Sequence, residues 1–266
     1  MKQRELELVV ATAGLAPRLA ETQAWRFVVA GHTLQVRTDE NVLDIVSARC
    51  CRIDCGAATE FVQRAMRSLG QTSTVRVLPH PNDPSLVATI TEGGRHWLAP
   101  TQPELSEVLR AVISGAHASS GAMMTAKFVS DLEAVAEERR CWIKVVRWDL
   151  VAEAGLRLGA ALPARSSEEL SPTSQLIVLG SDVDDAGSQI RIGRALASLV
   201  LTLGFAGFPV TVGAPVADVP GASAALARTL GVIGTPQVLL AVEKSNNPTS
   251  HGLGLGDEVS KAVLSA

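Results

Sequence analysis

Hydrophobic and polar positions follow two different spacings along the first part of the chain, and each spacing predicts a kind of element. A helical spacing runs from the start of the chain to about Gly14. Two β-type runs follow, WRFVVA and TLQVRTD, and the Gly31-His32 pair between them is typical of a turn. The pattern therefore predicts a helix followed by a β-hairpin.

The next stretch repeats this order. The apolar residues of GAATEFVQRAMRSLG fall on one face of a helix that ends at Gly70. TVRVLP and LVATITE then predict two short strands joined by the turn-rich HPNDPS.

Beyond the second strand pair, the spacing of Thr101 and Glu104 predicts a capped helix over LSEVLRAVI. A second helical pattern covers residues 128–136, and CWIKVV after it predicts a strand.

The C-terminal part is more apolar. QLIVLG is a continuous apolar run, which predicts a strand covered on both faces. The helical pattern of IRIGRALASLVLTLGFAG is apolar nearly all round from Ala195 to Leu203, which predicts a helix at the centre of the protein. ASAALARTLG predicts another helix and PQVLLAVEK a closing strand.

These elements predict an α+β protein whose two halves share a rough order of helices and strands. We expect an N-terminal half over residues 1–112 and a C-terminal half over residues 113–244. The polar, glycine-rich residues 245–266 are expected to form a loosely held tail.

Composition narrows the function classes. A chain of 266 residues that is 47% hydrophobic can bury a substantial core. Its net charge of −3 provides no basic field, so nucleic acid and anionic membranes are not expected partners. We find no apolar run of membrane-spanning length and no secretory pattern in MKQRELELVV, and therefore expect a cytoplasmic protein.

The cysteines do not form a metal motif. Cys50, Cys51 and Cys55 lie close together without a nearby histidine, so the local sequence offers no fourth zinc ligand. Small buried thiols at a strand-to-helix junction are the favoured interpretation, and a redox role for Cys50 and Cys51 stays open. No nucleophile elbow, zinc-protease motif or phosphate loop is present, so the sequence identifies no catalytic residue.

Two segments remain as candidates for binding. In ETQAWRF, the Gln23 amide could address the edge of a flat heterocycle, since it both donates and accepts hydrogen bonds. The alternative is structural, with Gln23 bonding to the backbone and Trp25 anchoring the core. HASSGAMMT at residues 117–125 could cradle a phosphate or could serve as an ordinary interhelical linker.

Several segments resemble a known family. APRLAETQAWRFVV resembles the A-P-S-X-X-N-X-Q-P-W-X-F segment of the flavin-dependent nitroreductase superfamily. The stretch from TLQVRTD to MRSLG is similar to the Acg-type, actinobacterial branch, with Asp54 to Ala58 in place of its Ser-Cys-Gly-Ala-Ala step. LIVLGSD, GRALASLVLTLGFAG and GTPQVLLAVEK are similar to the branch's central strand, buried helix and closing strand.

This resemblance implies a nitroreductase-like fold with FMN as the cofactor and a small organic molecule as the ligand. The Acg-type branch resembles two fused nitroreductase units, which implies a pseudo-dimeric monomer, although pairing into a homodimer stays open. The residues that match the flavin-binding positions are Arg18, Glu21, Thr22, Gln23 and Lys244. Arg18 and Glu21 replace the family's serine and asparagine, and Lys244 corresponds to a basic position expected to contact the phosphate.

The chain also departs from the branch in two places. An arginine-rich stretch that clamps the FMN phosphate corresponds to residues 115–123, which contain no arginine here. The chain is shorter around residues 155–170, where relatives carry helices and a lid over the flavin. The resemblance thus predicts an FMN-dependent oxidoreductase. The departures favour instead a degenerate nitroreductase-like protein that binds a partner or catalyses a flavin-independent biosynthetic step.

Overall fold

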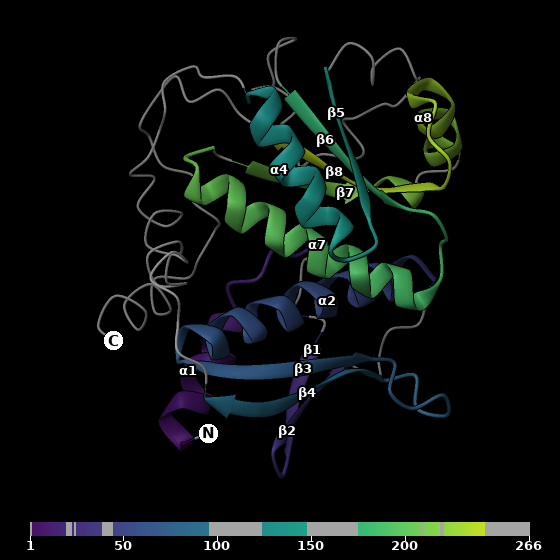
Figure 1. The fold of residues 1–266 in the computed structure, drawn as a ribbon. Helices are drawn as coiled ribbons and strands as arrows, with labels where there is room; N and C mark the ends of the chain where they lie inside the picture. Colours follow the sequence, from purple (N-terminus) through teal and green to yellow (C-terminus); the bar gives the residue numbers. More distant parts are fainter. Residues whose placement is uncertain are drawn as a thin grey trace.

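The protein combines helices with two antiparallel sheets in an α+β arrangement (Figure 1). The computed structural model describes residues 2–19, 23, 25–38, 45–95, 124–147, 175–208, 210–218 and 221–242. Each sheet has four strands. Two long helices, α2 (Ile45–Ser68) and α7 (Ala186–Phe205), pack against each other between the two sheets.

The first sheet belongs to the N-terminal part of the chain. Its strands have the spatial order β1-β2-β4-β3, with every neighbouring pair antiparallel. Helix α2 connects β2 to β3, and α1 precedes β1. The bounds are α1 (Gln3–Ala13), β1 (Trp25–Ala30), β2 (Thr33–Thr38), β3 (Gln71–Val77) and β4 (Leu86–Arg95).

The second sheet repeats this plan. Its order is β5-β6-β8-β7, again antiparallel throughout, with α7 connecting β6 to β7 and α4 preceding β5. The additional helices η2 and α8 lie between β7 and β8 in the chain. The bounds are α4 (Ala126–Glu137), β5 (Trp142–Arg147), β6 (Gln175–Ser181), β7 (Val210–Pro215), η2 (Val216–Asp218), α8 (Ala222–Leu230) and β8 (Thr235–Val242).

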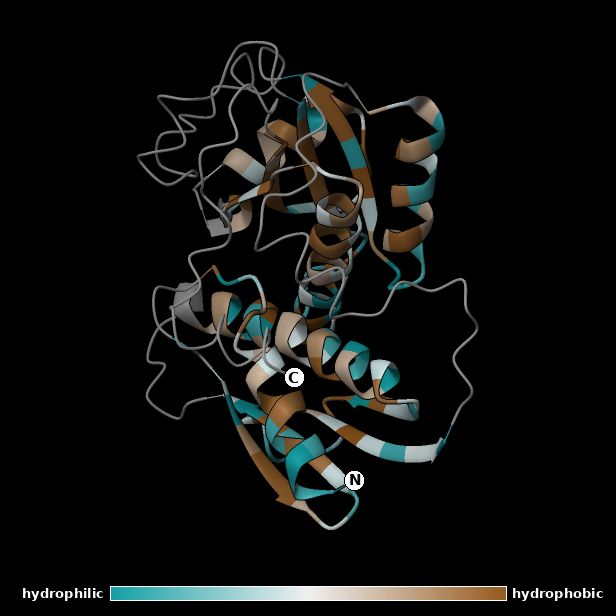
Figure 2. Cartoon of the chain, turned by 90° about the vertical axis from the view of Figure 1, so that its left-hand side faces the viewer, coloured by the Kyte–Doolittle hydropathy of each residue, from teal (hydrophilic) through white to brown (hydrophobic). Residues whose placement is uncertain are grey.

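The two sheets differ in how they are covered, and the sequence pattern reflects this. β3 alternates between less and more exposed side chains, because only one face of the first sheet packs against α2. β6 is buried along almost its whole length. Its Ile177 and Leu179 pack with the α7 core, whereas Leu176 and Val178 pack in the cluster that contains Leu226 of α8. In Figure 2, brown dominates the strands of the upper sheet, and teal and white are mixed with brown in the lower half.

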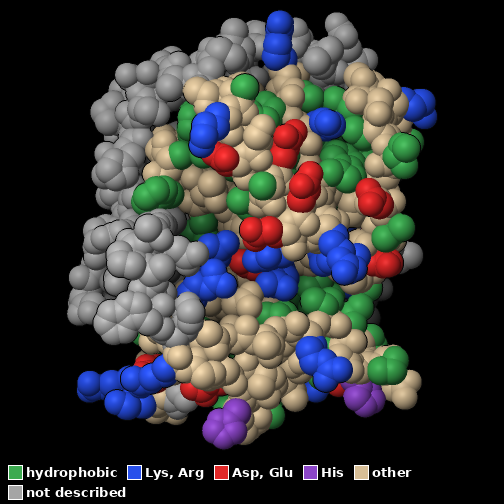
Figure 3. Space-filling view, in the orientation of Figure 1, with side chains coloured by type: hydrophobic (Ala, Val, Ile, Leu, Met, Phe, Trp, Pro, Cys, Tyr) green, Lys and Arg blue, Asp and Glu red, His purple; other side chains and the backbone are tan. Residues whose placement is uncertain are grey.

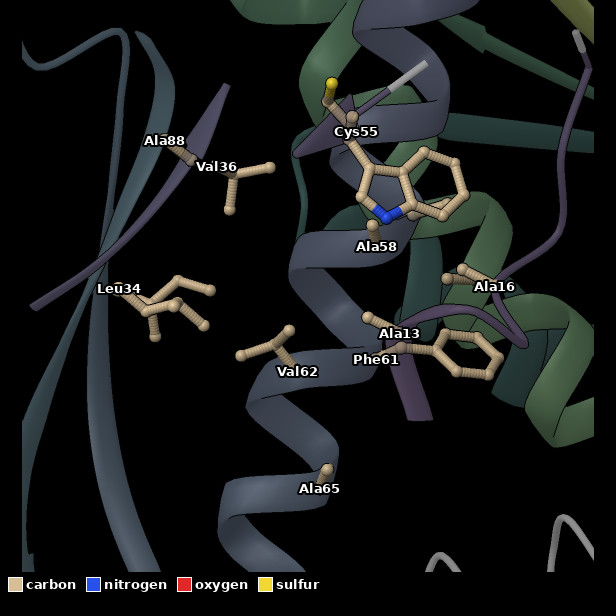
Figure 4. Close-up of a cluster of buried hydrophobic side chains, with 14 of the residues drawn as sticks. Ala13, Ala16, Leu34, Val36, Cys55, Ala58, Phe61, Val62, Ala65 and Ala88 are labelled. Atoms are coloured by element: carbon tan, nitrogen blue, oxygen red, sulfur yellow. The ribbon is translucent and has the colours of Figure 1, made fainter. Parts of the chain in front are cut away.

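The core of the first half lies between its sheet and α2. Figure 4 shows Leu34 and Val36 of β2 pointing toward Val62 and Ala58 of α2. All four side chains are at most 4% exposed. Alanine at position 58 lets the helix approach the sheet closely, since a small side chain leaves the backbone as the contact surface.

The close approach of α2 and α7 depends on two glycines. A Cβ atom at Gly56 would lie 2.1 Å from the carbonyl oxygen of Ile190, and one at Gly193 would lie 1.7 Å from that of Ile53. Each glycine therefore faces the carbonyl of the residue three positions before the other glycine. This reciprocity is what a two-fold relation between the helices produces.

Most of the predicted elements are confirmed, including the hairpin, the strand covered on both faces and the buried central helix. β7 was not predicted, because VTVGAP is short and contains glycine and proline. The placement of the cysteines at a strand-to-helix junction is wrong. Helix α2 already begins at Ile45, so Cys50, Cys51 and Cys55 lie within it. The helix predicted over LSEVLRAVI, the boundary between residues 112 and 113, and the tail fall outside the described residues.

Within the described ranges, no helix is both long and apolar enough to span a membrane.

Candidate functional site

The segment between α1 and β1 carries two of the side chains that the sequence singled out. α1 ends at Ala13, and the chain continues through buried Leu15, Ala16 and Pro17. Arg18 and Gln23 are both exposed on this segment. A guanidinium and a carboxamide are therefore presented to solvent from one connection between a helix and a strand.

A buried carboxylate from α2 holds this segment in place. Asp54 is fully buried, and its Oδ1 accepts a hydrogen bond of 2.7 Å from the backbone N–H of Leu19. A charge-assisted bond of this kind is stronger than one between neutral groups. Asp54 thus fixes the backbone next to Arg18. The sequence offers one sign of this role, since Asp54 is an ionisable residue within the mostly apolar Cys50–Ala58 stretch.

The other end of the segment is fixed by Gln23 and Trp25. Gln23 Nε2 donates a 3.0 Å hydrogen bond to the carbonyl oxygen of Trp25, whose ring is only 3% exposed. The structural role left open for these residues is therefore observed. Among the described residues, the buried Trp25 Nε1 finds no hydrogen-bond partner. An orphaned buried donor costs about 1–3 kcal/mol, so the packing of the ring must offset that cost.

The structure tests the predicted site only in part. Arg18 and Gln23 lie on one segment, but Glu21, Thr22 and Lys244 fall outside the described residues. The same holds for residues 115–123, where the phosphate-binding arginines are absent from the sequence, and for residues 155–170. The assembly of all five residues into one site stays a prediction.

A polar cluster that sequence reasoning missed joins the N-terminal ends of α2 and α7 to β8. Asp184 forms a two-pronged ion pair with Arg49, with N–O distances of 2.7 Å and 2.8 Å. The fully buried Gln237 donates to Asp184 Oδ1 at 3.0 Å and accepts from Arg49 at 2.8 Å. Burial raises the pKa of Asp184, but hydrogen bonds from Arg49, Gln189 and Gln237 outweigh it and bring the pKa to about 2. The glutamine of the Gly-X-Pro-Gln segment is therefore a structural bridge.

A second cluster surrounds Glu60, further along α2. Glu60 is 1% exposed and accepts hydrogen bonds from Arg139 at 2.8 Å, from Arg194 at 2.9 Å and from Ser198 at 3.2 Å. Arg64 contributes a further bond of 3.2 Å. Burial raises the pKa of Glu60, but the Arg139 hydrogen bonds and the three guanidinium charges outweigh it and bring the pKa to about 2. Figure 3 shows blue and red side chains gathered in a band across the middle of this face.

Burial keeps the thiols of two described cysteines, Cys55 and Cys141, in their neutral form. Burial raises the pKa of Cys55 well above its ordinary value, and it raises that of Cys141 to about 12. Buried thiols of this kind are unreactive. In the described part of the chain, no group of three or more histidine, cysteine or acidic side chains could hold a metal ion.

Comparison with known proteins gives partial similarity. No family model matches the chain. Two proteins of Mycobacterium tuberculosis, from strains CDC 1551 / Oshkosh and ATCC 25618 / H37Rv, are each 34% identical to it over 88 residues. Both carry the name "Putative NAD(P)H nitroreductase acg". The match covers 32% of this chain and 27% of each relative, so it spans about a quarter of the length of these curated proteins.

Proposed function

We propose that this protein is a nitroreductase-like oxidoreductase that uses FMN to transfer electrons or a hydride to a small organic acceptor. The observation that carries the proposal is the segment before β1, where Asp54 holds the backbone beside exposed Arg18 and Gln23. The 34% identity to a protein named as an NAD(P)H nitroreductase supports it. A reduced nicotinamide is the corresponding electron donor.

The side chains on this segment fit one part of a flavin. A carboxamide can donate to and accept from the pyrimidine edge of the isoalloxazine ring, and a guanidinium can donate to its carbonyl oxygens. In this proposal Arg18, Glu21, Thr22 and Gln23 address the ring, and Lys244 contacts the phosphate. When bound, the flavin supplies the redox chemistry, and the protein orients it and the acceptor. This division of roles agrees with a sequence that contains no catalytic motif.

The repeated plan of the two halves supports a pseudo-dimeric monomer. Both halves share one strand order, with α2 and α7 at equivalent places in the chain. We infer two fused nitroreductase-like units, over residues 1–112 and 113–244, that form the two walls of one flavin site. The described residues of one unit then present Gln23, and the other unit supplies Lys244.

A second candidate function has its own support. Gln23 Nε2 already donates to the Trp25 carbonyl, and residues 115–123 contain no arginine for a phosphate. Each lost charge-assisted contact removes about 1.5–3 kcal/mol of binding free energy. A protein with these changes would have lost FMN and would act as a binding partner or in a flavin-independent step.

The visible spectrum of the purified chain, with and without added FMN, separates the two candidates. If the protein binds FMN, its spectrum should show an absorption band at about 450 nm, and adding the protein to FMN should quench the flavin fluorescence. Gln23→Ala should weaken that titration, whereas Gln3→Ala should not, because Gln3 is an exposed glutamine of α1 that bonds to Glu7. A colourless protein that leaves the fluorescence of FMN unchanged at high protein concentration rules out the first candidate.

A further inference from the structure

Three arginines converge on Glu60 from three different elements. Arg64 comes from α2, Arg194 from α7 and Arg139 from the turn after α4. We call these three side chains the arginine triad. Glu60 Oε1 accepts from Arg64 and Arg139, and Oε2 accepts from Arg139 and Arg194. With a further bond from Ser198, the carboxylate has no acceptor capacity left.

Among the residues that the structure describes, the triad carries more positive charge than its acidic neighbours neutralise. One buried carboxylate faces three guanidiniums. Glu138 also approaches Arg139 at 3.4 Å, but its side chain is 67% exposed, so solvent weakens that pair. The Arg194 and Arg139 side chains are only 13% and 19% exposed. Burying cations with incomplete compensation is energetically unfavourable.

The pKa of Arg139 lies above its ordinary value, because its bonds and attraction to Glu60 outweigh burial, whereas the pKa of Arg194 lies below its ordinary value. Burial lowers the pKa of the Arg194 guanidinium, Glu60 raises it, and repulsion by Arg139 and Arg64 lowers it again. A further anion close to the triad would relieve this repulsion.

Part of the donor capacity of the triad faces solvent. Arg64 donates from Nε to Glu60 and from Nη2 to Ser198 at a long 3.5 Å, and Arg194 donates from Nε and Nη2. Within the described part of the chain, Nη1 of Arg64 and Nη1 of Arg194 have no hydrogen-bond partner, and neither is among the buried polar atoms without one. The Arg64 side chain is 36% exposed, so its guanidinium keeps N–H groups within reach of solvent.

We propose that the arginine triad binds a phosphate group, either as inorganic phosphate or as the terminal group of a phosphate monoester. A phosphate dianion matches the excess of two positive charges left after Glu60 is counted. Its oxygens suit the planar N–H pairs of guanidinium groups. The Nη1 groups of Arg64 and Arg194 bind the oxygens, while Glu60 holds the inner edges of the triad.

The triad uses none of the residues proposed to bind FMN. Asp54, which holds the segment with Arg18 and Gln23, and Glu60 lie six residues apart on α2. At about 100° per residue they project from different sides of the helix. The phosphate site therefore does not depend on the proposed function, and it can be tested without flavin.

Calorimetric titration of the full chain with inorganic phosphate and with glycerol 3-phosphate tests the proposal, in chloride buffers of matched ionic strength. We expect saturable binding that Arg64→Gln weakens roughly tenfold or more, the equivalent of one lost charge-assisted contact. Arg67→Gln is the matched control. It removes the same charge from an exposed position on α2, one turn further along, and should leave binding unchanged. If Arg64→Gln does not fold, Arg64→Lys keeps the charge, loses the planar fork and should still weaken binding.

The two titrants distinguish the sources of the phosphate. Tighter binding of the monoester identifies an esterified ligand, and equal or weaker binding identifies free phosphate. Glu60→Gln provides a second readout, since phosphate should raise the melting temperature of this variant more than that of the natural protein. The proposal is overturned if phosphate acts no differently from chloride, or if Arg64→Gln and Arg67→Gln respond alike.

Discussion

Gly193→Ala tests the close crossing of α2 and α7, on which both polar clusters depend. The new Cβ would lie 1.7 Å from the carbonyl oxygen of Ile53, and also 2.7 Å from its carbonyl carbon and 2.8 Å from the backbone nitrogen of Ala57. All three are backbone atoms of α2, so no side-chain rotation relieves the overlap. The helices must separate by more than about 1 Å, which loosens a close-packed interface.

We expect Gly193→Ala to lower the free energy of unfolding by about 3 kcal/mol or more. The gain in helix propensity from replacing glycine by alanine, about 1 kcal/mol, offsets only part of the overlap. For a chain of this size, such a loss lowers Tm by roughly 6–12 °C. Differential scanning calorimetry and urea unfolding measure both quantities.

Gly187→Ala is the matched control on the same helix. Its Cβ would make only ordinary contacts of 3.4 Å with the Arg191 and Asp185 side chains. We expect it to be neutral or to stabilise the protein by up to about 1 kcal/mol. If Gly193→Ala proves as stable as Gly187→Ala, the backbone-to-backbone crossing is refuted.

Three further predictions concern buried groups. Asp54→Ala removes the acceptor for the Leu19 N–H and should lower the free energy of unfolding by about 1–3 kcal/mol, which urea unfolding measures. Unchanged stability would contradict the role of Asp54 in holding the segment before β1. The pKa of Glu60 falls to about 2 from an ordinary 4.5. Its ionised form therefore contributes on the order of 3 kcal/mol to the free energy of unfolding above pH 4.5, and this contribution is lost as the pH falls toward 2. Glu60→Gln should flatten this part of the curve of unfolding free energy against pH, and an unchanged slope would refute the assignment. Gly180→Ala places a Cβ 2.2 Å from the Trp142 ring and should lower Tm. An unchanged Tm together with a changed tryptophan fluorescence would show that the Trp142 ring moves aside instead.

The local pattern of the sequence was sufficient for most of the helices and strands. The apolar face of residues 56–70 required a helix, and the continuous apolar run of QLIVLG required a strand covered on both sides. Both requirements arise from burying side chains at a fixed period, which neighbouring residues alone determine. The first turns of α2 were missed, because its polar Arg49 and Arg52 face polar partners on α7 and β8 that lie more than 130 positions away in the chain.

The family resemblance singled out Arg18 and Gln23, which lie on the segment before the buried Trp25; their part in binding stays a prediction. The sequence did not show that Asp54 holds this segment, that Gln23 bonds to the Trp25 carbonyl, or that three arginines surround Glu60. The arginines and Ser198 gather around Glu60 only once α2 and α7 cross at Gly56 and Gly193 and bring distant parts of the chain together. Periodicity records which side of an element is buried. The tertiary structure decides which charges share that buried space, because ion pairing depends on distances that no local spacing encodes.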